Sequence, residues 1–260
     1  MSRSSFDKPL VFLFFCFTFS LLATTNALAE SQMAVPYRWV SEHYPPYNYQ
    51  DENGHAKGMS VDVVKAIWER MEVPEADRKI EFMPWARGYS IAQSELNAVI
   101  FSTTYTDDRL GKFSFVGPVF PVNVVILARK SDRLQVTTVD QLNKLKLGVV
   151  RQDIGEQLLL KRGVDASAIV STNSVHQLIK LLDLGRIDGI AYGYEIAVWS
   201  MRELNIELSQ YEIVYPLLEG QLGFAFNKKV DKDQLQRMQA VLEELKSEGV
   251  LEKIRKNYLE

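Results

Sequence analysis

The sequence predicts an α/β fold in two successive units, each a mostly parallel sheet flanked by helices, joined by a two-stranded hinge. Strand and helix patterns alternate over residues 38–102 and again over residues 138–192, which is typical of parallel sheets. An extended segment leaves each unit. With 260 residues and 47% hydrophobic content, the chain can form one large core or two smaller ones.

The first unit begins with an expected strand at residues 38–40 and a turn-rich stretch at residues 51–54. A helix is expected after Ser60, because apolar side chains recur at i, i+3, i+4 and i+7 from Val64, and Pro74 ends it. The alternation continues with a strand at residues 80–83, a helix at 88–95 and a strand at 98–102.

Capping signals mark three helices of the second unit. Each combines a residue typical of a helix N-cap with a glutamine or glutamate three positions later, and Gly163 and Gly185 provide helix ends. The pairs are Thr138 with Gln141, Asp153 with Glu156, and Ser174 with Gln177. Strands are expected after the first of these helices, at residues 147–150, and after the third, at residues 187–192.

The two extended segments, residues 122–128 and 222–227, are expected to lie side by side as the hinge. Helices follow at residues 234–245 and 250–258, a segment too small to form its own domain. Such a segment must pack on an existing domain, and we expect it to return to the first lobe. Lobe 1 then comprises residues 30–123 and 222–260, and lobe 2 comprises residues 124–221.

The N-terminal residues 1–29 have the pattern of a secretory signal peptide. Arg3 and Lys8 precede an apolar run at residues 10–23, and Ala29 closes a stretch of small residues. The run is shorter than the roughly 20 residues of a membrane helix. Cleavage near Ala29 is therefore favoured over an uncleaved anchor, and a periplasmic protein without stable membrane insertion is expected.

The composition of the chain gives no indication of a nucleic-acid partner. The net charge is −3 and the pI is near 5.8, which gives no electrostatic footprint for nucleic acid. The one cysteine, Cys16, lies in the expected signal peptide. The exported chain is therefore expected to be held together by its apolar core alone, as a monomer.

Several segments, in this order and spacing, resemble the bacterial extracellular solute-binding proteins, family 3. The resemblance runs from about Trp39 to Tyr258. It implies the two-lobed periplasmic-binding-protein fold, type II-like, which closes over a small carboxylate ligand such as an amino acid, and an inner-membrane ABC permease as the partner. The segments are Tyr44-Pro45-Pro46-Tyr47-Asn48-Tyr49, Gly54, Gly58-Met59-Ser60-Val61-Asp62-Val63-Val64, Thr106-Asp107-Asp108-Arg109 and Gly185-Arg186-Ile187-Asp188-Gly189.

Arg109 is the first candidate for a ligand contact, because a guanidinium fork matches a carboxylate. The resemblance places Arg109 on the ligand α-carboxylate, together with Thr104, and it places the Ser102 carbonyl at the ligand amine. The alternative is an exposed arginine paired with Asp107 or Asp108. We expect Arg109→Ala to abolish binding and to leave melting nearly native.

Aromatic walls are implied at Tyr44 and Trp85, whose alternatives are a turn residue and a core residue respectively. Aromatic faces also suit a cation. Arg87 is either a second anion contact or a member of a surface ion pair.

From the second lobe, the resemblance implies that Arg151 reaches the ligand side chain. The amides of Ile154 and Gly155 open a helix and can seat an anion. The alternative is an ordinary helix capped by Asp153.

One position departs from the family pattern. The usual ammonium-binding aspartate comes five residues after Asp188, where this chain has Gly193. Tyr192, Tyr194 and Glu195 are near enough in sequence to substitute. If none of these residues contacts the ligand amine, the ligand is expected to lack an α-amine. Asp188 itself is expected to have a structural role.

No cofactor or metal is expected from sequence. His43, His55 and His176 are far apart along the chain, and no phosphate-binding or nucleophile motif is present.

Two alternative functions remain open. One is an exported enzyme of the same fold that dehydrates cyclic carboxylates, with Glu195 or Glu42 as proton donor. The other is a free ligand-sensing module. The chain ends at Glu260 without a signalling domain, which favours transport binding.

Overall fold

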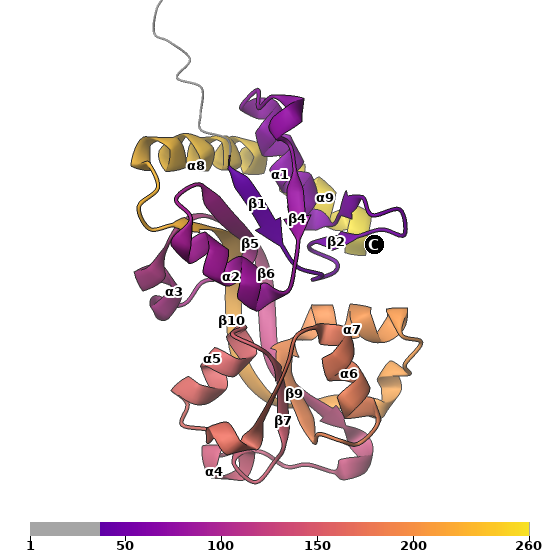
Figure 1. The fold of residues 1–260 in the computed structure, drawn as a ribbon. Coiled ribbons are helices and arrows are strands. Elements are labelled where there is room, and N and C mark those ends of the chain that lie inside the picture. Colours follow the sequence, from indigo (N-terminus) through magenta and orange to yellow (C-terminus); the bar gives the residue numbers. More distant parts are fainter. Residues whose placement is uncertain (1–36, 260) are drawn as a thin grey trace, which may run out of the picture. The chain divides into compact units, whose positions relative to one another are not determined.

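The computed structural model describes residues 37–259, so the expected signal peptide lies outside the described residues. The part from Pro36 to Glu260 forms one compact unit. Its main sheet has the strand order β4-β1-β5-β10-β6-β9-β7-β8. The chain forms two lobes, as expected, with helices packed on the main sheet (Figure 1).

Lobe 1 is built around β1, which pairs in parallel with β4 and β5. The first half of the chain supplies the strands β1 (Arg38–Ser41), β4 (Ile80–Phe82) and β5 (Ala98–Thr104), the small hairpin β2 (Tyr49–Gln50) and β3 (Ala56–Lys57), and the helices α1 (Met59–Arg70), α2 (Trp85–Ser94) and α3 (Asp107–Lys112). The helix expected at residues 88–95 thus begins earlier, at Trp85, immediately after Pro84.

Lobe 2 is built around β7, which pairs in parallel with β8 and β9. Its elements are α4 (Val139–Leu142), β7 (Leu147–Val150), α5 (Ile154–Lys161), β8 (Ile169–Thr172), α6 (Val175–Asp183), β9 (Gly189–Gly193) and α7 (Tyr194–Glu203). The capping box of Thr138 and Gln141 is confirmed, with both reciprocal bonds formed. Positive φ values at Gly163 and Gly185 confirm the expected helix ends.

The lobes are joined by two long antiparallel strands, β6 (Phe113–Arg129) and β10 (Tyr211–Asn227), which run side by side (Figure 1). The register differs from the expected one. Residues 122–128 pair with residues 212–220, and residues 222–227 pair with residues 113–120. The register of an antiparallel pair is set by the side-chain pattern along the whole of both strands. The two segments expected to pair as the hinge therefore lie in neighbouring strands but are not paired with each other.

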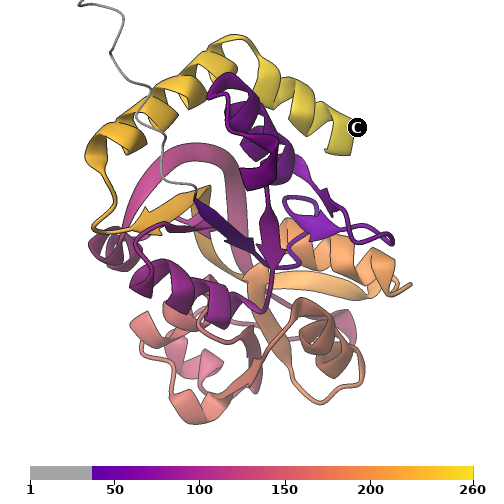
Figure 2. The same cartoon turned by 45° about the horizontal axis from the view of Figure 1, so that its top comes forward.

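The last helices, α8 (Lys232–Ser247) and α9 (Val250–Leu259), return to α1 (Figure 2). Tyr258 fixes this return. Its hydroxyl donates to Asp62 Oδ2 at 2.9 Å and accepts from the Gly58 N–H at 3.0 Å. Gly58 has φ 119°, and a Cβ there would lie 2.4 Å from the Tyr47 carbonyl oxygen, so only glycine fits.

The aromatic core of lobe 1 includes side chains from the crossing strand. Trp39 makes edge-to-face contacts with Trp68, Phe101 and Phe224 at centroid distances of 5.8, 6.1 and 5.7 Å. Such pairs contribute about 0.5–1.5 kcal/mol each beyond their buried area. Because Phe224 belongs to β10, the same core that stabilises lobe 1 also anchors one strand of the hinge.

Candidate ligand-binding site

The Arg109 side chain is buried against aromatic rings of lobe 1, with 1% of its surface exposed. Its Cζ lies 5.1 Å from the ring centroid of Trp85 and 5.7 Å from that of Tyr89. Nη1 donates to the Thr104 carbonyl at 3.2 Å, and the backbone N–H donates to the N-cap hydroxyl of Thr106. The alternative of a solvent-exposed arginine is therefore wrong.

Arg109 also contacts lobe 2. Nε donates to Gln157 Oε1 at 3.2 Å, and Nη2 lies 3.7 Å from Oδ1 of Asp153. Asp153 occupies the N-cap position of α5, but its carboxylate makes no capping bond. The alternative of an ordinary helix capped by Asp153 is thus not seen, because its carboxylate faces Arg109. Asp107, an alternative partner for Arg109, lies 4.0 Å from Lys161.

Glu42 adds a second buried carboxyl, with 8% of the residue exposed. Burial raises the pKa of Glu42 well above its ordinary value, the nearby Asp153 carboxylate raises it further, and Arg109 opposes the shift. Burial likewise raises the pKa of Asp153, again opposed by Arg109. Two carboxyl groups thus share one guanidinium, and an additional cation here would favour the ionised form of both acids.

Several buried polar atoms of this region have no hydrogen-bond partner within residues 37–259. A buried unpaired polar group costs about 1–3 kcal/mol, and native structures contain few of them. Their concentration here is typical of a site that bonds a polar ligand. The atoms are Nη2 of Arg109, Oδ2 of Asp153 and the hydroxyls of Tyr89 and Tyr192.

Tyr44 and Tyr192 bring aromatic rings together from the two lobes, with centroids 5.7 Å apart and planes at 75°. Burial raises the pKa of both hydroxyls well above the ordinary value, so both stay protonated. The Tyr44 hydroxyl lies 2.9 Å from where a Cβ on Gly193 would stand. That Cβ would also lie 2.5 Å from Ile196 Cδ1, so a side chain at position 193 would require Tyr44 and Ile196 to move.

Ser102 and Gln152 approach the site with unusual backbone conformations, φ 56° and φ 59° respectively. Non-glycine residues seldom adopt this region, and those that do cluster at functional sites. The Ser102 hydroxyl donates to Ser60 Oγ at 2.9 Å. The Gln152 carbonyl accepts from Trp85 Nε1 at 2.9 Å, a direct bond between the lobes.

The structure does not bring three of the predicted residues into this cluster. Arg87 and Arg151 are exposed, and Arg87 acts electrostatically on Glu81, whose pKa it helps to lower after the larger effect of Arg38. Glu195 accepts a hydrogen bond from Asn123 Nδ2 at 2.8 Å, beside the hinge. Among the hydrogen bonds and ion pairs of residues 37–259, none joins these three side chains to Arg109, Asp153 or Glu42, although all three are close to the site in sequence.

Ile154 and Gly155 open α5 and are both buried. A Cβ on Gly155 would lie 2.0 Å from the Ala191 carbonyl oxygen, so glycine allows α5 to lie against β9. This packing brings the start of α5, and Asp153 with it, up to Arg109.

A cavity of about 250 Å³ lies beside the cluster and is lined from both lobes. Glu42 joins the cluster to this cavity. The other lining residues are His43, Gln50, Phe82, Met83, Pro84, Asn173 and Ser174.

Sequence reasoning assigned no ligand role to Asp153, Gln157 or His176. The sequence pattern around Asp153 indicates a helix cap, and no sequence pattern marks Gln157 as a functional residue. His43 and His176 were set aside as distant in sequence, yet their rings lie 4.9 Å apart. The spacing of residues along the sequence cannot identify such pairs, because they come together only through the topology of the sheet.

The fold agrees with the comparisons to known proteins. The sequence profile of the bacterial extracellular solute-binding proteins, family 3, matches residues 39–260. The chain belongs to this family, as a divergent member.

The relatives are distant but cover most of the chain. A probable histidine-binding protein of Neisseria gonorrhoeae is 25% identical over 228 residues, which are 85% of this chain and 82% of that protein. Among solved structures, a histidine kinase sensor domain with similarity to periplasmic binding proteins has a TM-score of 0.73 at 25% identity, covering 86% of this chain and 96% of that one.

ArgBP from T. maritima, in a mutant form, also gives a TM-score of 0.73 at 25% identity, with 86% and 95% coverage. Family members are extracellular or periplasmic binding proteins. Between residues 37 and 259, no helix combines the length and apolar character needed to cross a bilayer.

Proposed function

We propose that this protein captures a small carboxylate ligand, an amino acid or a derivative of one, between its two lobes in the periplasm and delivers it to an inner-membrane ABC importer. One observation carries the proposal: Arg109 of lobe 1 and Asp153 of lobe 2 face each other in a buried, aromatic-walled site. The lobes are assigned as residues 30–123 with 222–260, and residues 124–221. Residues 1–29 are assigned as a signal peptide cleaved near Ala29, and the mature protein as a monomer.

The charges of the site favour a ligand that carries both a carboxylate and an ammonium group. Arg109 is assigned to the carboxylate, with the Thr104 and Ser102 backbone nearby. Glu42 and Asp153 are assigned to the ammonium, a role that Gly193 cannot perform. A ligand with both groups relieves the shortage of positive charge around the two acids, and it supplies partners for the unpaired Nη2 and Oδ2 atoms.

The aromatic rings of Trp85, Tyr44 and Tyr192 support the same assignment, because ring faces attract cations when water is excluded. The named relatives point the same way, since one is described as a probable histidine-binding protein and ArgBP from T. maritima is described in an arginine-bound form. Closure requires that the ligand bind the closed state better than the open one. Contacts from both lobes to one ligand supply that difference.

The direct test is a thermal-shift screen of the exported protein with amino acids and with matched acids that lack the α-amine. A ligand at about 100 times its Kd stabilises the folded state by about 2.7 kcal/mol. We expect shifts from amino acids and none from their amine-free counterparts.

Equal shifts from both series contradict the assignment of Glu42 and Asp153 to the ammonium group. Silence across both series contradicts the amino-acid proposal itself. The next assay is then turnover of cyclic carboxylates, with Glu42→Gln as the matched inactive variant.

A further inference from the structure

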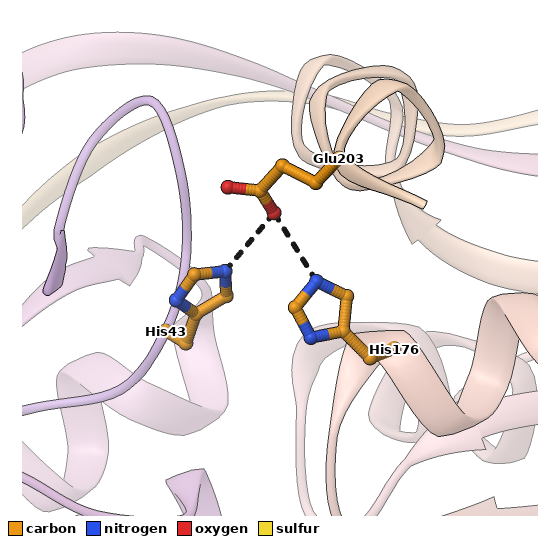
Figure 3. A group of neighbouring side chains, drawn as sticks. All are labelled: His43, His176 and Glu203. Carbon is orange, nitrogen blue, oxygen red and sulfur yellow. Dashed lines mark hydrogen bonds and ion pairs between the residues drawn. The ribbon is translucent and has the colours of Figure 1, made fainter. Parts of the chain in front are cut away.

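His43, His176 and Glu203 form a compact cluster at the junction of the two lobes (Figure 3). His43 lies in the loop after β1, His176 lies in the first turn of α6, and Glu203 is the last residue of α7. Both imidazole Nε2 atoms point at the same carboxylate oxygen, Oε2 of Glu203, at 3.2 Å from His43 and 3.1 Å from His176.

The spacing of these atoms is close to that of a metal-bound ligand set. One nitrogen or oxygen atom from each residue lies within 4.8 Å of the others. A tetrahedral Zn²⁺ with bonds of about 2.0–2.2 Å separates neighbouring ligand atoms by about 3.3–3.5 Å. The two nitrogen to oxygen distances, 3.2 and 3.1 Å, need to lengthen by only a few tenths of an ångström.

We propose that His43, His176 and Glu203 bind a divalent transition-metal ion of the Zn²⁺ type, with one coordination position left for water or another ligand. Two imidazoles and one carboxylate are a donor set used by zinc sites with an open position. Imidazole nitrogen also suits Ni²⁺ and Cu²⁺, and it disfavours Mg²⁺ and Ca²⁺.

Two further features suit metal binding. The second oxygen of Glu203 accepts a hydrogen bond from Trp199 Nε1 at 3.2 Å; such outer contacts orient a ligating carboxylate. The side chains of His43, His176 and Glu203 are 36%, 37% and 34% exposed. An ion therefore has a path from solvent.

The consequence is a metal ion that bridges the lobes. His43 belongs to lobe 1 and lines the cavity between the lobes, whereas α6 and α7 belong to lobe 2. All three ligands meet only when the lobes are together, so the ion binds the closed state best and shifts the equilibrium toward it. The metal site stands on its own geometry, and the coupling to solute capture rests on the proposed function.

Metal binding is tested with Zn²⁺ alone, without solute. The exported protein, stripped with a chelator, is titrated by calorimetry and checked by equilibrium dialysis with metal analysis. We expect one Zn²⁺ per chain. We expect each of three variants to weaken Zn²⁺ binding at least about tenfold: His43→Ala, His176→Ala and Glu203→Gln. Even the loss of a residue that only contacts a metal ligand lowers metal affinity by about that factor.

The matched control is His55→Ala. His55 is 72% exposed and pairs with Asp51 in a surface turn, so its removal leaves Zn²⁺ affinity unchanged. Far-UV spectra and melting confirm that each variant is folded. Absence of saturable Zn²⁺ binding, or equal affinity in the wild type and the three cluster variants, overturns the metal site.

The coupling is tested by measuring affinity for the amino acid found in the thermal screen, with and without Zn²⁺. We expect Zn²⁺ to tighten solute binding and the solute to tighten Zn²⁺ binding by the same factor. His43→Ala keeps both lobe 2 ligands and loses the coupling. Unchanged solute affinity in a Zn²⁺-loaded protein overturns the bridge. Zn²⁺ binding without any amino-acid binding overturns the proposed function and leaves the metal site in place.

Discussion

Arg109 is buried and faces Asp153, so its removal affects stability as well as binding. Arg109→Ala leaves the Asp153 carboxylate buried without its counter-charge, and breaking such a pair costs about 3 kcal/mol or more. We therefore expect loss of ligand binding together with a lower urea midpoint, and the near-native melting expected from sequence does not follow from this structure.

The matched control for Arg109 is Arg87→Ala. Arg87 is an exposed arginine, and its removal is expected to change stability by no more than about 0.5 kcal/mol. Asp153→Asn in the Arg109→Ala background removes the unpaired charge and restores part of the loss. Equal urea midpoints for Arg109→Ala and Arg87→Ala contradict the buried pair.

Glu42 makes stability depend on pH. Its folded-state pKa is raised above the ordinary value of 4.5 by burial first and by Asp153 second, so the native state binds more protons than the unfolded state. Stability then falls as pH rises from about 4.5 through the raised pKa. Glutamine has no proton to lose, so Glu42→Gln is expected to be more stable than wild type at pH 7 and to lose this advantage near pH 4.5.

The measurement for Glu42 is urea unfolding at both pH values. Glu195→Gln is the control, because Glu195 lies beside Asn123 and outside the buried cluster. A difference between Glu42→Gln and wild type that is the same at both pH values contradicts the role of Glu42.

At the scale of the element, the Tyr258 hydroxyl adds a polar link between α9 and the start of α1. Tyr258→Phe leaves the Gly58 N–H and Asp62 without this partner, and we expect a loss of about 1 kcal/mol, measured by urea unfolding. Tyr194→Phe is the control, because Tyr194 is 36% exposed. If both variants unfold alike, the tie between the last helix and the first is not a source of stability.

At the scale of the whole molecule, direct bonds between the lobes set how readily they close. Trp85→Phe keeps an aromatic side chain, although a smaller one, and removes the donor to the Gln152 carbonyl. Loss of about 1 kcal/mol from the closed state weakens ligand binding about fivefold when closure limits affinity. Small-angle scattering without ligand is expected to show a larger radius of gyration than wild type. An unchanged radius with weaker binding assigns the effect to ligand contact alone.

The elements themselves were predictable because their signals are local. The box of Thr138 and Gln141 forms within one turn, and Gly163 and Gly185 end their helices through their own φ angles. Periodic apolar residues after Ser60 mark the buried face of α1. Each of these patterns involves residues only a few positions apart, where backbone geometry leaves little choice.

The sequence by itself determined the alternation of strands and helices and the helix ends. Only the tertiary structure decided the register of β6 with β10, the meeting of Arg109 with Asp153, and the cluster of His43, His176 and Glu203. The physical reason is range. Local propensities determine the backbone of each element. Contacts between polar side chains that are distant in sequence depend on which strand ends and helix starts the folded lobes bring together.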